Sequence, residues 1–509
     1  MEFYTNDFIE ILKGQEPSKI ILQERNQTIT AKELLLSSYE LAYQLNQKGV
    51  NTGDRTIIAL KPGIEFLRIM YANMFLRTVI SIIDPEMGRD NYTAKLKQFE
   101  PQIAFVDSRL VLLNEHPILK FVVLRLNHLI PDFPRIKNCK LFTTGLNLPI
   151  FQKHFHIKNT SGNIVELPAL KTGDLNDDFL ITYTSGTLAE PKGVLHSFNS
   201  LNNSIKLLCE LLIKNKDESI ATHLPHFALL GINAGVSVYL WNNGLNAKDK
   251  IEFIIKNNIS TLFGPPSDFL PLIKYAEMNK IELPNCLQNI YLGSAPVYSS
   301  FLKRMICVAG KINITCLYGM TENLMVCFQD GRLKAEENVE GDLVGTPFSG
   351  VSLSMTPEME IDIQSNQMFT RYWKGTSAGE IHLTGDLGRI DEKGRLILIG
   401  RKKDMIIRGN FNIYPGLYEP TINKIVGVIE SAMIGIYNEI KHNEDVILVI
   451  ESEKKLNEAE IINQLRRGQF SIDKKAIPDR IIFMKLPRFG RQNKVNKKLL
   501  IEHLKNQIL

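Results

Sequence analysis

The sequence predicts an α/β protein in which parallel sheets precede a smaller α+β unit. Three short β-branched runs, TIIAL (56–60), VISII (79–83) and QIAFV (102–106), have the length and composition of strands. Residues 31–48 carry apolar side chains at helical spacing, and this pattern ends at Gly49. Strands that alternate with helices in this way favour parallel sheets.

The sequence pattern changes near residue 380. EIHLTGDLGRIDEKGRLILIGRKKDMII (380–407) has two strand-like stretches around the turn EKG, which indicates antiparallel pieces. Beyond Arg401 the chain is more basic and predicts a strand at 446–450, a helix at 456–467 and a strand at 481–484. We therefore expect a boundary near 400–404 that separates a domain of residues 1–401 from one of residues 402–509.

The composition is that of an ordinary globular protein. Among 509 residues, 60 Lys and Arg face 55 Asp and Glu, and a net charge of +5 does not by itself argue for nucleic acid. Ordinary amounts of Gly and Pro exclude collagenous and disordered classes. The six cysteines match neither a disulfide framework nor a zinc pattern, and the N-terminus does not resemble a signal peptide. A reduced, cytoplasmic setting is expected.

One apolar stretch raises the question of a membrane span. Residues 219–247 contain no Asp, Glu, Lys or Arg, and 227–241 is strongly apolar. A bilayer span needs about 20 apolar residues, whereas this run is interrupted by Asn233 and flanked by Pro225 and Asn242. We expect a buried core segment and no transmembrane helix.

The segment YTSGTLAEPKGVLHS (183–197) suits the binding of a polyphosphate. It combines hydroxyl groups, a glycine that allows close backbone approach and the charge of Lys192. It is not a Walker loop, because Pro191 stands where that motif needs Gly. A surface turn rich in Ser and Thr explains this segment alone equally well.

Further blocks follow this segment in a fixed order, and together they resemble the AMP-forming acyl-adenylating superfamily. The resemblance covers nearly the whole chain. It implies a large N-terminal acyl-CoA-synthetase-like domain of layered sheets and helices, followed by a small, mobile α+β domain. The blocks are YLGSAPV (291–297), LYGMTEN (317–323), HLTGDLGRID (382–391), GRKKDMIIRGNFNIYP (400–415) and LPRFGRQNKVNKKLL (486–500).

The resemblance implies an ATP site whose parts have plausible chemistry. An aromatic ring at Tyr318 can stack on a purine, Asp386 can accept hydrogen bonds from ribose hydroxyls, and Glu322 can hold Mg²⁺ against phosphate oxygens. Taken singly, each residue is better explained by a structural role, and only the joint resemblance reverses that preference. The implied ATP-binding residues are Thr184, Ser185, Gly186, Thr187, Lys192, Gly293, Ser294, Ala295, Pro296, Tyr318, Gly319, Thr321, Asp386 and Arg401.

Lys494 is the main catalytic candidate, with Glu322 and Lys192 beside it. A carboxylate that attacks the α-phosphate of ATP faces like-charge repulsion, which a lysine offsets. The superfamily carries such a lysine near the C-terminus. Here the stretch from Pro487 to Lys494 has one extra residue and an Asn where the family has Gly. The alternative is that residues 485–505 are only a basic patch.

The resemblance also assigns roles around the acyl group and the thiol. Lys403 falls where the family has its hinge, and Gly409 would line the path of the thiol. Phe227, Ala228 and Gly264 would line the acyl pocket, where the small side chain of Ala228 suggests an open tunnel.

Several features depart from the family or imitate other sites. Leu188 and Ala189 replace a Thr and a Gly of the family's phosphate loop, and we expect this change to weaken ATP use. His223 and His226 have no cysteine or suitable carboxylate nearby, which argues against a metal site. GTSAG (375–379) matches a nucleophile elbow, but a strand rather than a helix is expected after it, so we predict a β-turn.

The expected activity is ATP-dependent formation of an acyl-AMP from a fatty acid and transfer of the acyl group to a thiol, most simply CoA, with Mg²⁺ accompanying ATP. Segments at 81–106, 224–235 and 261–269 resemble the branch that includes olefin-pathway β-lactone synthetases, whereas the hinge block resembles ordinary acyl-CoA ligases. A β-lactone synthetase, an acyl-carrier-protein ligase and a degenerate nucleotide-binding relative remain alternatives. No nucleic-acid partner is expected.

Overall fold

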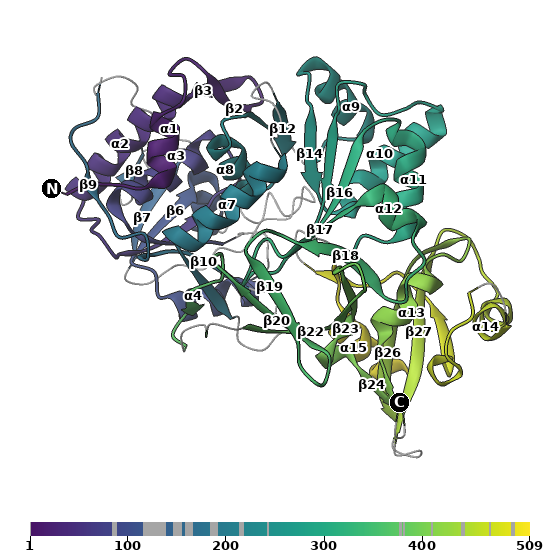
Figure 1. The fold of residues 1–509 in the computed structure, drawn as a ribbon. Helices are drawn as coiled ribbons and strands as arrows, with labels where there is room; N and C mark the ends of the chain where they lie inside the picture. Colours follow the sequence, from purple (N-terminus) through teal and green to yellow (C-terminus); the bar gives the residue numbers. More distant parts are fainter. Residues whose placement is uncertain are drawn as a thin grey trace. The chain divides into compact units, whose positions relative to one another are not determined.

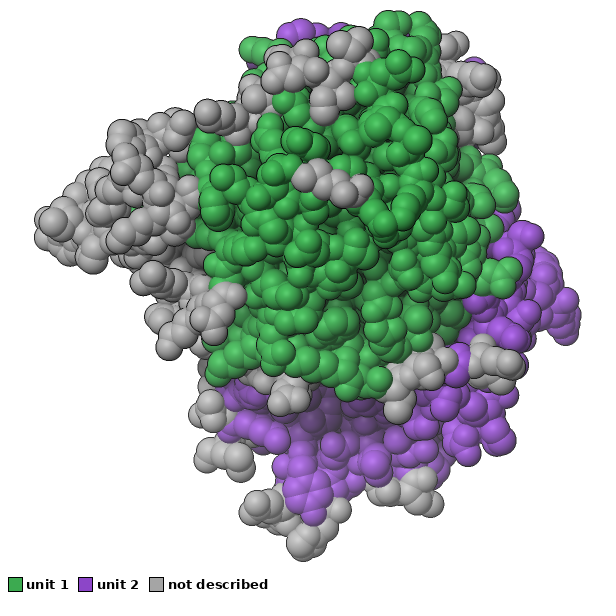
Figure 2. Space-filling model, turned by 90° about the vertical axis from the view of Figure 1, so that its left-hand side faces the viewer, with its two compact units in different colours: residues 1–245, 321–324, 366–378 green, residues 246–320, 325–365, 379–509 purple. Residues whose placement is uncertain are grey.

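A computed structural model describes residues 2–83, 89–115, 139–145, 155–157, 166–183, 192–212, 218–241, 244–375, 379, 382–408, 411–438, 443–467, 470–489 and 494–508 (Figure 1). The chain divides into two units, each built from segments that are distant in the sequence. Unit 1 comprises Met1–Leu245, Thr321–Leu324 and Asn366–Ala378, and unit 2 comprises Asn246–Met320, Met325–Ser365 and Gly379–Leu509 (Figure 2).

Unit 1 contains an eight-stranded sheet in the order β21-β11-β10-β5-β4-β6-β7-β8. The pairs from β10 to β8 are parallel, whereas β11 runs antiparallel to β10 and β21. Buried side chains such as Ile57, Ala104 and Ile181 pack in one cluster on this sheet. The strands are β4 (Arg55–Ala59), β5 (Val79–Ile82), β6 (Ile103–Asp107), β7 (Lys140–Thr144), β8 (Phe155–His156), β10 (Asp178–Tyr183), β11 (Gly193–Ser197) and β21 (Arg371–Tyr372).

The helices of unit 1 follow the predicted alternation. The longest of them begins with a capping box, in which Thr30 and Glu33 satisfy each other's backbone donors. The helices are α1 (Asp7–Lys13), α2 (Ala31–Gln47), α3 (Ile64–Leu76), α4 (Arg89–Phe99), α5 (Ser108–Glu115), α7 (Phe198–Leu212) and α8 (Pro225–Asn233).

The apolar stretch at 219–247 folds as a strand, a helix and a strand: β12 (Ser219–Thr222), α8 and β13 (Ser237–Leu240). β12 and β13 are parallel, and β13 pairs in turn with β2 (Ile20–Glu24), which forms a hairpin with β3 (Gln27–Thr30). A two-stranded ladder joins β1 (Tyr4–Thr5) to β9 (Lys171–Thr172). Within the described ranges, every helix is too short or too polar to cross a membrane.

Unit 2 begins with a mixed sheet. β14 to β16 are parallel, and the following neighbours β17, β18, β23, β22, β20 and β19 are antiparallel. The predicted antiparallel pieces around the turn EKG are β22 and β23. The elements are α9 (Ala247–Lys256), β14 (Thr261–Gly264), α10 (Pro266–Asn279), β15 (Asn289–Leu292), α11 (Ser299–Ala309), β16 (Asn313–Tyr318), β17 (Cys327–Asp330), α12 (Gly331–Glu336), β18 (Asp342–Pro347), β19 (Val351–Met355), β20 (Glu360–Ser365), β22 (His382–Ile390) and β23 (Leu396–Arg401).

The last hundred residues build a sheet with a core on each face. Along β27, Val446 and Leu448 face one buried cluster, whereas Ile447 and Val449 face a second cluster that includes Leu500 of α15. This alternation follows from the two-residue period of a strand. The elements are η3 (Lys402–Asp404), β24 (Ile406–Arg408), β25 (Phe411–Ile413), α13 (Pro415–Ile422), β26 (Val428–Asn438), β27 (Asn443–Ser452), α14 (Glu458–Arg467), η4 (Lys474–Ala476), β28 (Arg480–Phe483), β29 (Arg488–Phe489), β30 (Lys494–Val495) and α15 (Lys497–Ile508).

The predicted fold class, an α/β protein with layered sheets and helices, is confirmed by these sheets and their connecting helices. Unit 2 extends across residues 401 and 402, so the domain boundary at that point and the mobility of the C-terminal part stay predictions.

Candidate active site

Asp386 is the centre of a polar cluster in unit 2. It lies in β22 directly opposite Arg401 of β23, and the Arg401 guanidinium forms an ion pair with its Oδ1 atom. The Tyr318 hydroxyl, at the end of β16, donates a hydrogen bond of 2.7 Å to Oδ2. Asp386 is only 4% exposed. Two residues from separate strands, Arg401 and Tyr318, therefore meet at the buried carboxylate of Asp386, which lies on a third strand.

Electrostatics link Lys494 to this cluster. Burial raises the pKa of Asp386, and the charge of Arg401, the bond from Tyr318 and the charge of Lys494 oppose the rise. Burial and the Asp386 charge raise the pKa of Tyr318 well above its ordinary value, so its hydroxyl stays a donor. Burial, and then repulsion from Arg401, lower the pKa of Lys494, while attraction to Asp386 opposes this shift. The charge of the Lys494 ammonium therefore interacts with the charges of both Asp386 and Arg401.

This arrangement fits a nucleotide. A buried carboxylate can accept hydrogen bonds from two neighbouring ribose hydroxyls, and a guanidinium and an ammonium beside it can face phosphate oxygens. The Tyr318 ring belongs to the same group, because its hydroxyl is fixed on Asp386.

The turn at 293–296 lies beside Tyr318. β15 and β16 are parallel, with Leu292 opposite Cys316, and a Cβ atom on Gly293 would lie 3.4 Å from the Leu317 side chain. Ser294 adopts a φ of 66°, in the left-handed region that costs a non-glycine residue about 1 kcal/mol. Such conformations concentrate at binding sites, where the backbone must turn sharply.

Lys494 is carried by the short antiparallel hairpin of β29 and β30. Phe489 lies opposite Lys494 and Arg488 lies opposite Val495. The backbone N–H of Asn496 closes the hairpin with a 2.7 Å hydrogen bond to the Pro487 carbonyl. The Lys494 side chain is half-buried, and its assignment as a catalytic residue stays a prediction.

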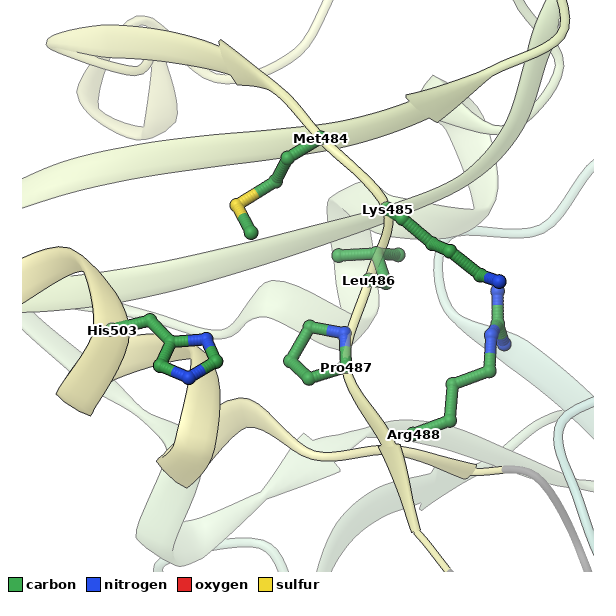
Figure 3. Close-up of a pocket in the computed structure, with 6 residues that line it drawn as sticks. All are labelled: Met484, Lys485, Leu486, Pro487, Arg488 and His503. Atoms are coloured by element: carbon green, nitrogen blue, oxygen red, sulfur yellow. The ribbon is translucent and has the colours of Figure 1, made fainter. Parts of the chain in front are cut away.

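A cavity of about 420 Å³ lies at the base of this hairpin (Figure 3). No residue that lines it belongs to the Asp386 cluster, so we do not assign it to the nucleotide. Its lining residues are Met484, Lys485, Leu486, Pro487, Arg488 and His503.

Unit 1 contains a second polar group, centred on Glu322. The Tyr372 hydroxyl donates a 3.1 Å hydrogen bond to Glu322 Oε1, and the backbone N–H of Phe369 donates to the Glu322 carbonyl at 2.9 Å. Lys192 Nζ lies 5.4 Å from the centre of the Tyr372 ring. Burial and the Glu322 charge raise the pKa of Tyr372, which keeps its hydroxyl protonated. Glu322 and Lys192 therefore both lie beside Tyr372, Glu322 at its hydroxyl and Lys192 near its ring.

His196 fixes the backbone just before Glu322. Its Nε2 atom lies 2.8 Å from the Thr321 carbonyl oxygen, and Ser200 Oγ lies 3.4 Å from Nδ1. The carbonyl can only accept, so Nε2 carries the proton. Burial lowers the pKa of His196 to about 4, against a weaker opposing effect of the Thr321 carbonyl. The neutral ring thus links β11 to Thr321, the residue before Glu322.

The donor set fits Mg²⁺ held mainly by ATP. Glu322 offers hard carboxylate oxygens, of which Oε1 already accepts from Tyr372. Among the described residues, no group of three or more His, Cys, Asp and Glu side chains could form a metal cage. At nucleotide sites Mg²⁺ takes most of its ligands from phosphates and water, and one carboxylate such as Glu322 is enough beside them.

The remaining predicted residues are not joined to either group by the described contacts. Thr184, Ser185, Gly186, Thr187 and Gly409 lie outside the described residues, as do Leu188 and Ala189. Lys403 is exposed on η3. Phe227 and Ala228 are buried in α8, and Gly264 ends β14 with its α-carbon facing Asp268. All six cysteines are free.

Two residues of these groups were not singled out from the sequence, namely His196 and Tyr372. His196 stands among apolar residues of a buried strand, and Tyr372 stands next to Trp373, so both positions resemble core positions. No spacing in the sequence relates them to Thr321 and Glu322, because β11 and β21 meet only in the folded sheet.

The nucleophile-elbow motif GTSAG falls mostly outside the described residues, since only Gly375 and Gly379 are described. The first element after it is the strand β22, not the helix that a nucleophile elbow requires. The β-turn expected there stays a prediction.

Comparison with known proteins places these groups in context. The model of the AMP-binding enzyme family matches residues 12–387. The Bacillus subtilis protein named "Putative acyl--CoA ligase YdaB" is 24% identical over 489 residues, which cover 88% of this chain and 93% of that protein. The long-chain-fatty-acid–CoA ligase FadD13 of Mycobacterium tuberculosis is 24% identical over 332 residues, which cover 61% of this chain and 65% of that protein.

The fold also has a solved counterpart. The crystal structure of ATP-bound MatB from Rhodopseudomonas palustris matches with a TM-score of 0.79 and 22% identity, over 99% of each chain. At this identity the match establishes the shared fold.

Proposed function

Because the chain belongs to the AMP-binding enzyme family, we propose that it is an AMP-forming acid–thiol ligase that joins a fatty acid to coenzyme A. The observation that carries this proposal is the convergence of Tyr318, Arg401 and Lys494 on Asp386. A buried carboxylate beside a phenol, a guanidinium and an ammonium can serve a ribose and its phosphates.

The first half-reaction would form an acyl-AMP. A carboxylate oxygen of the acid attacks the α-phosphorus of ATP, the bond from that phosphorus to the oxygen bridging it to the β-phosphorus breaks, and pyrophosphate leaves with the electron pair. Two anions approach each other in this step, so a cation at the transferred phosphorus lowers the barrier. Lys494 is the group we propose for that role.

The other residues would hold the nucleotide in place. Asp386 accepts from the ribose hydroxyls, the Tyr318 ring lies against the adenine, and Arg401 faces the ribose and phosphate. Glu322 supports Mg²⁺, which neutralises phosphate charge when bound. Lys192 adds a second cation for the phosphates.

In the second half-reaction the thiolate sulfur of CoA attacks the acyl carbon and AMP leaves. The thiol proton passes to solvent. Lys403 would serve as the hinge that changes the arrangement of the C-terminal part between the two steps, and Gly409 would allow the thiol to approach.

A fatty acid is the substrate class we propose. Support comes from the names of the relatives, an acyl-CoA ligase and a long-chain-fatty-acid–CoA ligase. Ala228 adds a small, buried side chain on α8, which leaves more room than an aromatic residue would. We further propose a cytoplasmic reaction, since six free cysteines suit a reducing compartment.

The test is acid-dependent release of pyrophosphate from ATP across a panel of fatty acids, with and without CoA. We expect release with a fatty acid, faster turnover with CoA and stoichiometric acyl-CoA. If pyrophosphate is released only with 3-hydroxy acids, and no CoA is consumed, the protein would be a β-lactone synthetase instead. Release that needs an acyl carrier protein instead of CoA would make the protein a carrier-protein ligase. The absence of any release would indicate a degenerate nucleotide-binding relative.

A further inference from the structure

Arg488 lies between two carboxylates on neighbouring strands. Its Nη1 atom is 2.6 Å from Glu430 Oε2 on β26, and its Nη2 atom is 2.8 Å from Glu451 Oε2 on β27. Each of the three side chains is about one-fifth exposed. The planar guanidinium, labelled in Figure 3, matches this geometry because it offers donors in two directions at once.

The two carboxylates need such a partner. Glu430 and Glu451 are direct cross-strand neighbours in the antiparallel ladder of β26 and β27. Like charges at opposed positions destabilise a sheet, and burial adds to the cost. Burial raises the pKa of Glu430, and the Arg488 charge and hydrogen bond oppose that rise. Arg488 therefore compensates a repulsion that the sheet would otherwise carry.

The same residue begins the hairpin that carries Lys494. Arg488 lies opposite Val495, the next residue after Lys494. The hairpin has two residues in each described strand, and a two-stranded hairpin is marginal without further packing. Leu486, buried against Leu500, holds the chain just before it, and the Leu486 N–H donates to Glu451 Oε2 at 3.2 Å.

A second ion pair holds the chain after the hairpin. Lys497 Nζ lies 2.6 Å from Glu419 Oε1, which also accepts from the Met433 N–H at 2.7 Å. Arg488 thus fastens the start of the hairpin to the sheet, and Lys497 fastens the chain after it to Glu419 of α13. Lys494, between them, has Asp386 and Arg401 as its charged neighbours.

We propose that Arg488 is a positioning residue that fixes Lys494 beside Asp386 by clamping the hairpin onto Glu430 and Glu451. This inference rests on the proposed function for the reaction that Lys494 serves. It predicts a selective effect, because only the first half-reaction uses Lys494. A displacement of about 1 Å of a reacting group can cost about 10²-fold in rate.

The test compares Arg488→Gln, Arg488→Lys and Lys494→Ala with the double variant Arg488→Gln/Lys494→Ala. Arg395 provides a matched control, because it also binds two carboxylates, Glu337 and Asp391, but lies in the turn after β22. For each variant we would measure acid-dependent ATP–pyrophosphate exchange and the transfer of the acyl group from supplied acyl-AMP to CoA.

We expect Arg488→Gln to slow exchange by at least about tenfold and to leave transfer within about twofold, and Arg488→Lys to be intermediate because it keeps the charge without the fork. The double variant should exchange no more slowly than Lys494→Ala, since Arg488 acts through Lys494. Arg395→Gln should leave the ratio of the two rates unchanged. Equal loss of both rates in Arg488→Gln, or an additive double variant, would overturn the proposal.

Two measures keep the result decisive. If Arg488→Gln does not fold, the neutral set Glu430→Gln/Glu451→Gln/Arg488→Met removes the clamp without leaving unpaired carboxylates, and the same split is expected. Hydrogen exchange of the backbone around 488–496 needs no activity. We expect faster exchange in Arg488→Gln there and not in Arg395→Gln, and unchanged exchange would refute the clamp. An inactive wild-type protein would count against the proposed function alone.

Discussion

The Tyr318 hydroxyl donates a hydrogen bond of 2.7 Å to Asp386, a residue 68 positions later in the chain. The bond joins the end of β16, which is parallel to β15 and antiparallel to β17, to β22, which is antiparallel to both its neighbours. It keeps the Asp386 carboxylate, which also pairs with Arg401, in a single orientation. At the proposed nucleotide site, the hydrogen bond from Tyr318 therefore affects both the orientation of the Asp386 carboxylate and its pKa.

Tyr318→Phe should weaken ATP binding more than it slows turnover. The variant keeps the ring that lies against adenine but leaves one oxygen of a buried carboxylate without its donor, at a cost of about 1–3 kcal/mol. We expect the KM for ATP to rise several-fold with a smaller change in kcat, together with a lower midpoint of urea unfolding. Tyr437→Phe, at an exposed site, is the control. An unchanged KM would contradict the role of Asp386 in ribose binding.

Tyr372→Phe should raise the Mg²⁺ concentration needed for pyrophosphate release. The change removes the 3.1 Å hydrogen bond to Glu322 and keeps the ring near Lys192. A freely rotating carboxylate binds the ion less well, so half-saturation should shift upward by about threefold to tenfold. Glu322→Gln should shift it further. The measurement is a Mg²⁺ titration at saturating ATP and acid, and equal titration curves for Tyr372→Phe and wild type would refute the prediction.

His196 should make the protein less stable at mildly acidic pH. Burial lowers its pKa from 6.5 to about 4, so between these values the unfolded state binds a proton that the folded state does not. The stability is complete above the unfolded value and falls as pH decreases through this window, by about 1.4 kcal/mol per unit. Near pH 5 the loss is therefore roughly 2 kcal/mol.

His196→Gln tests this effect. Glutamine can still donate to the Thr321 carbonyl but does not titrate, so urea unfolding at pH 7.5 and pH 5 should differ by less than in wild type. His503→Gln, on the exposed face of α15, should leave the difference unchanged. A pH difference as large in His196→Gln as in wild type would assign the effect to other groups.

Lys494→Ala should abolish acyl-AMP formation and largely spare thioester formation from supplied acyl-AMP. Because burial and Arg401 lower the pKa of Lys494, the wild-type rate of the first step should also decline at a lower pH than an ordinary lysine would give. Both expectations are checked by pyrophosphate exchange and CoA acylation over an alkaline pH series. Equal loss of both half-reactions in the variant would mean that another residue serves the phosphate.

The sequence predicted the regular elements well where a local pattern encodes them. Helical spacing at 31–48 became α2, and the runs at 56–60, 79–83 and 102–106 became three parallel strands, β4, β5 and β6. The turn EKG between two alternating segments gave β22 and β23. In each case the period of the apolar residues is set by contacts within the element and its adjacent layer.

The sequence alone identified a hydroxyl-rich loop, a set of ordered blocks that resemble the acyl-adenylating superfamily, and Lys494 near the end of the chain. Each of these features can be recognised from residues that are close together in the sequence. Only the tertiary structure decided which side chains share an electrostatic field. Arg401 faces Asp386 because two antiparallel strands align, Tyr372 reaches Glu322 through a sheet contact, and Arg488 separates two glutamates that cross-strand register brings together. Such pairings depend on register and on burial, and neither is encoded within a short stretch of sequence.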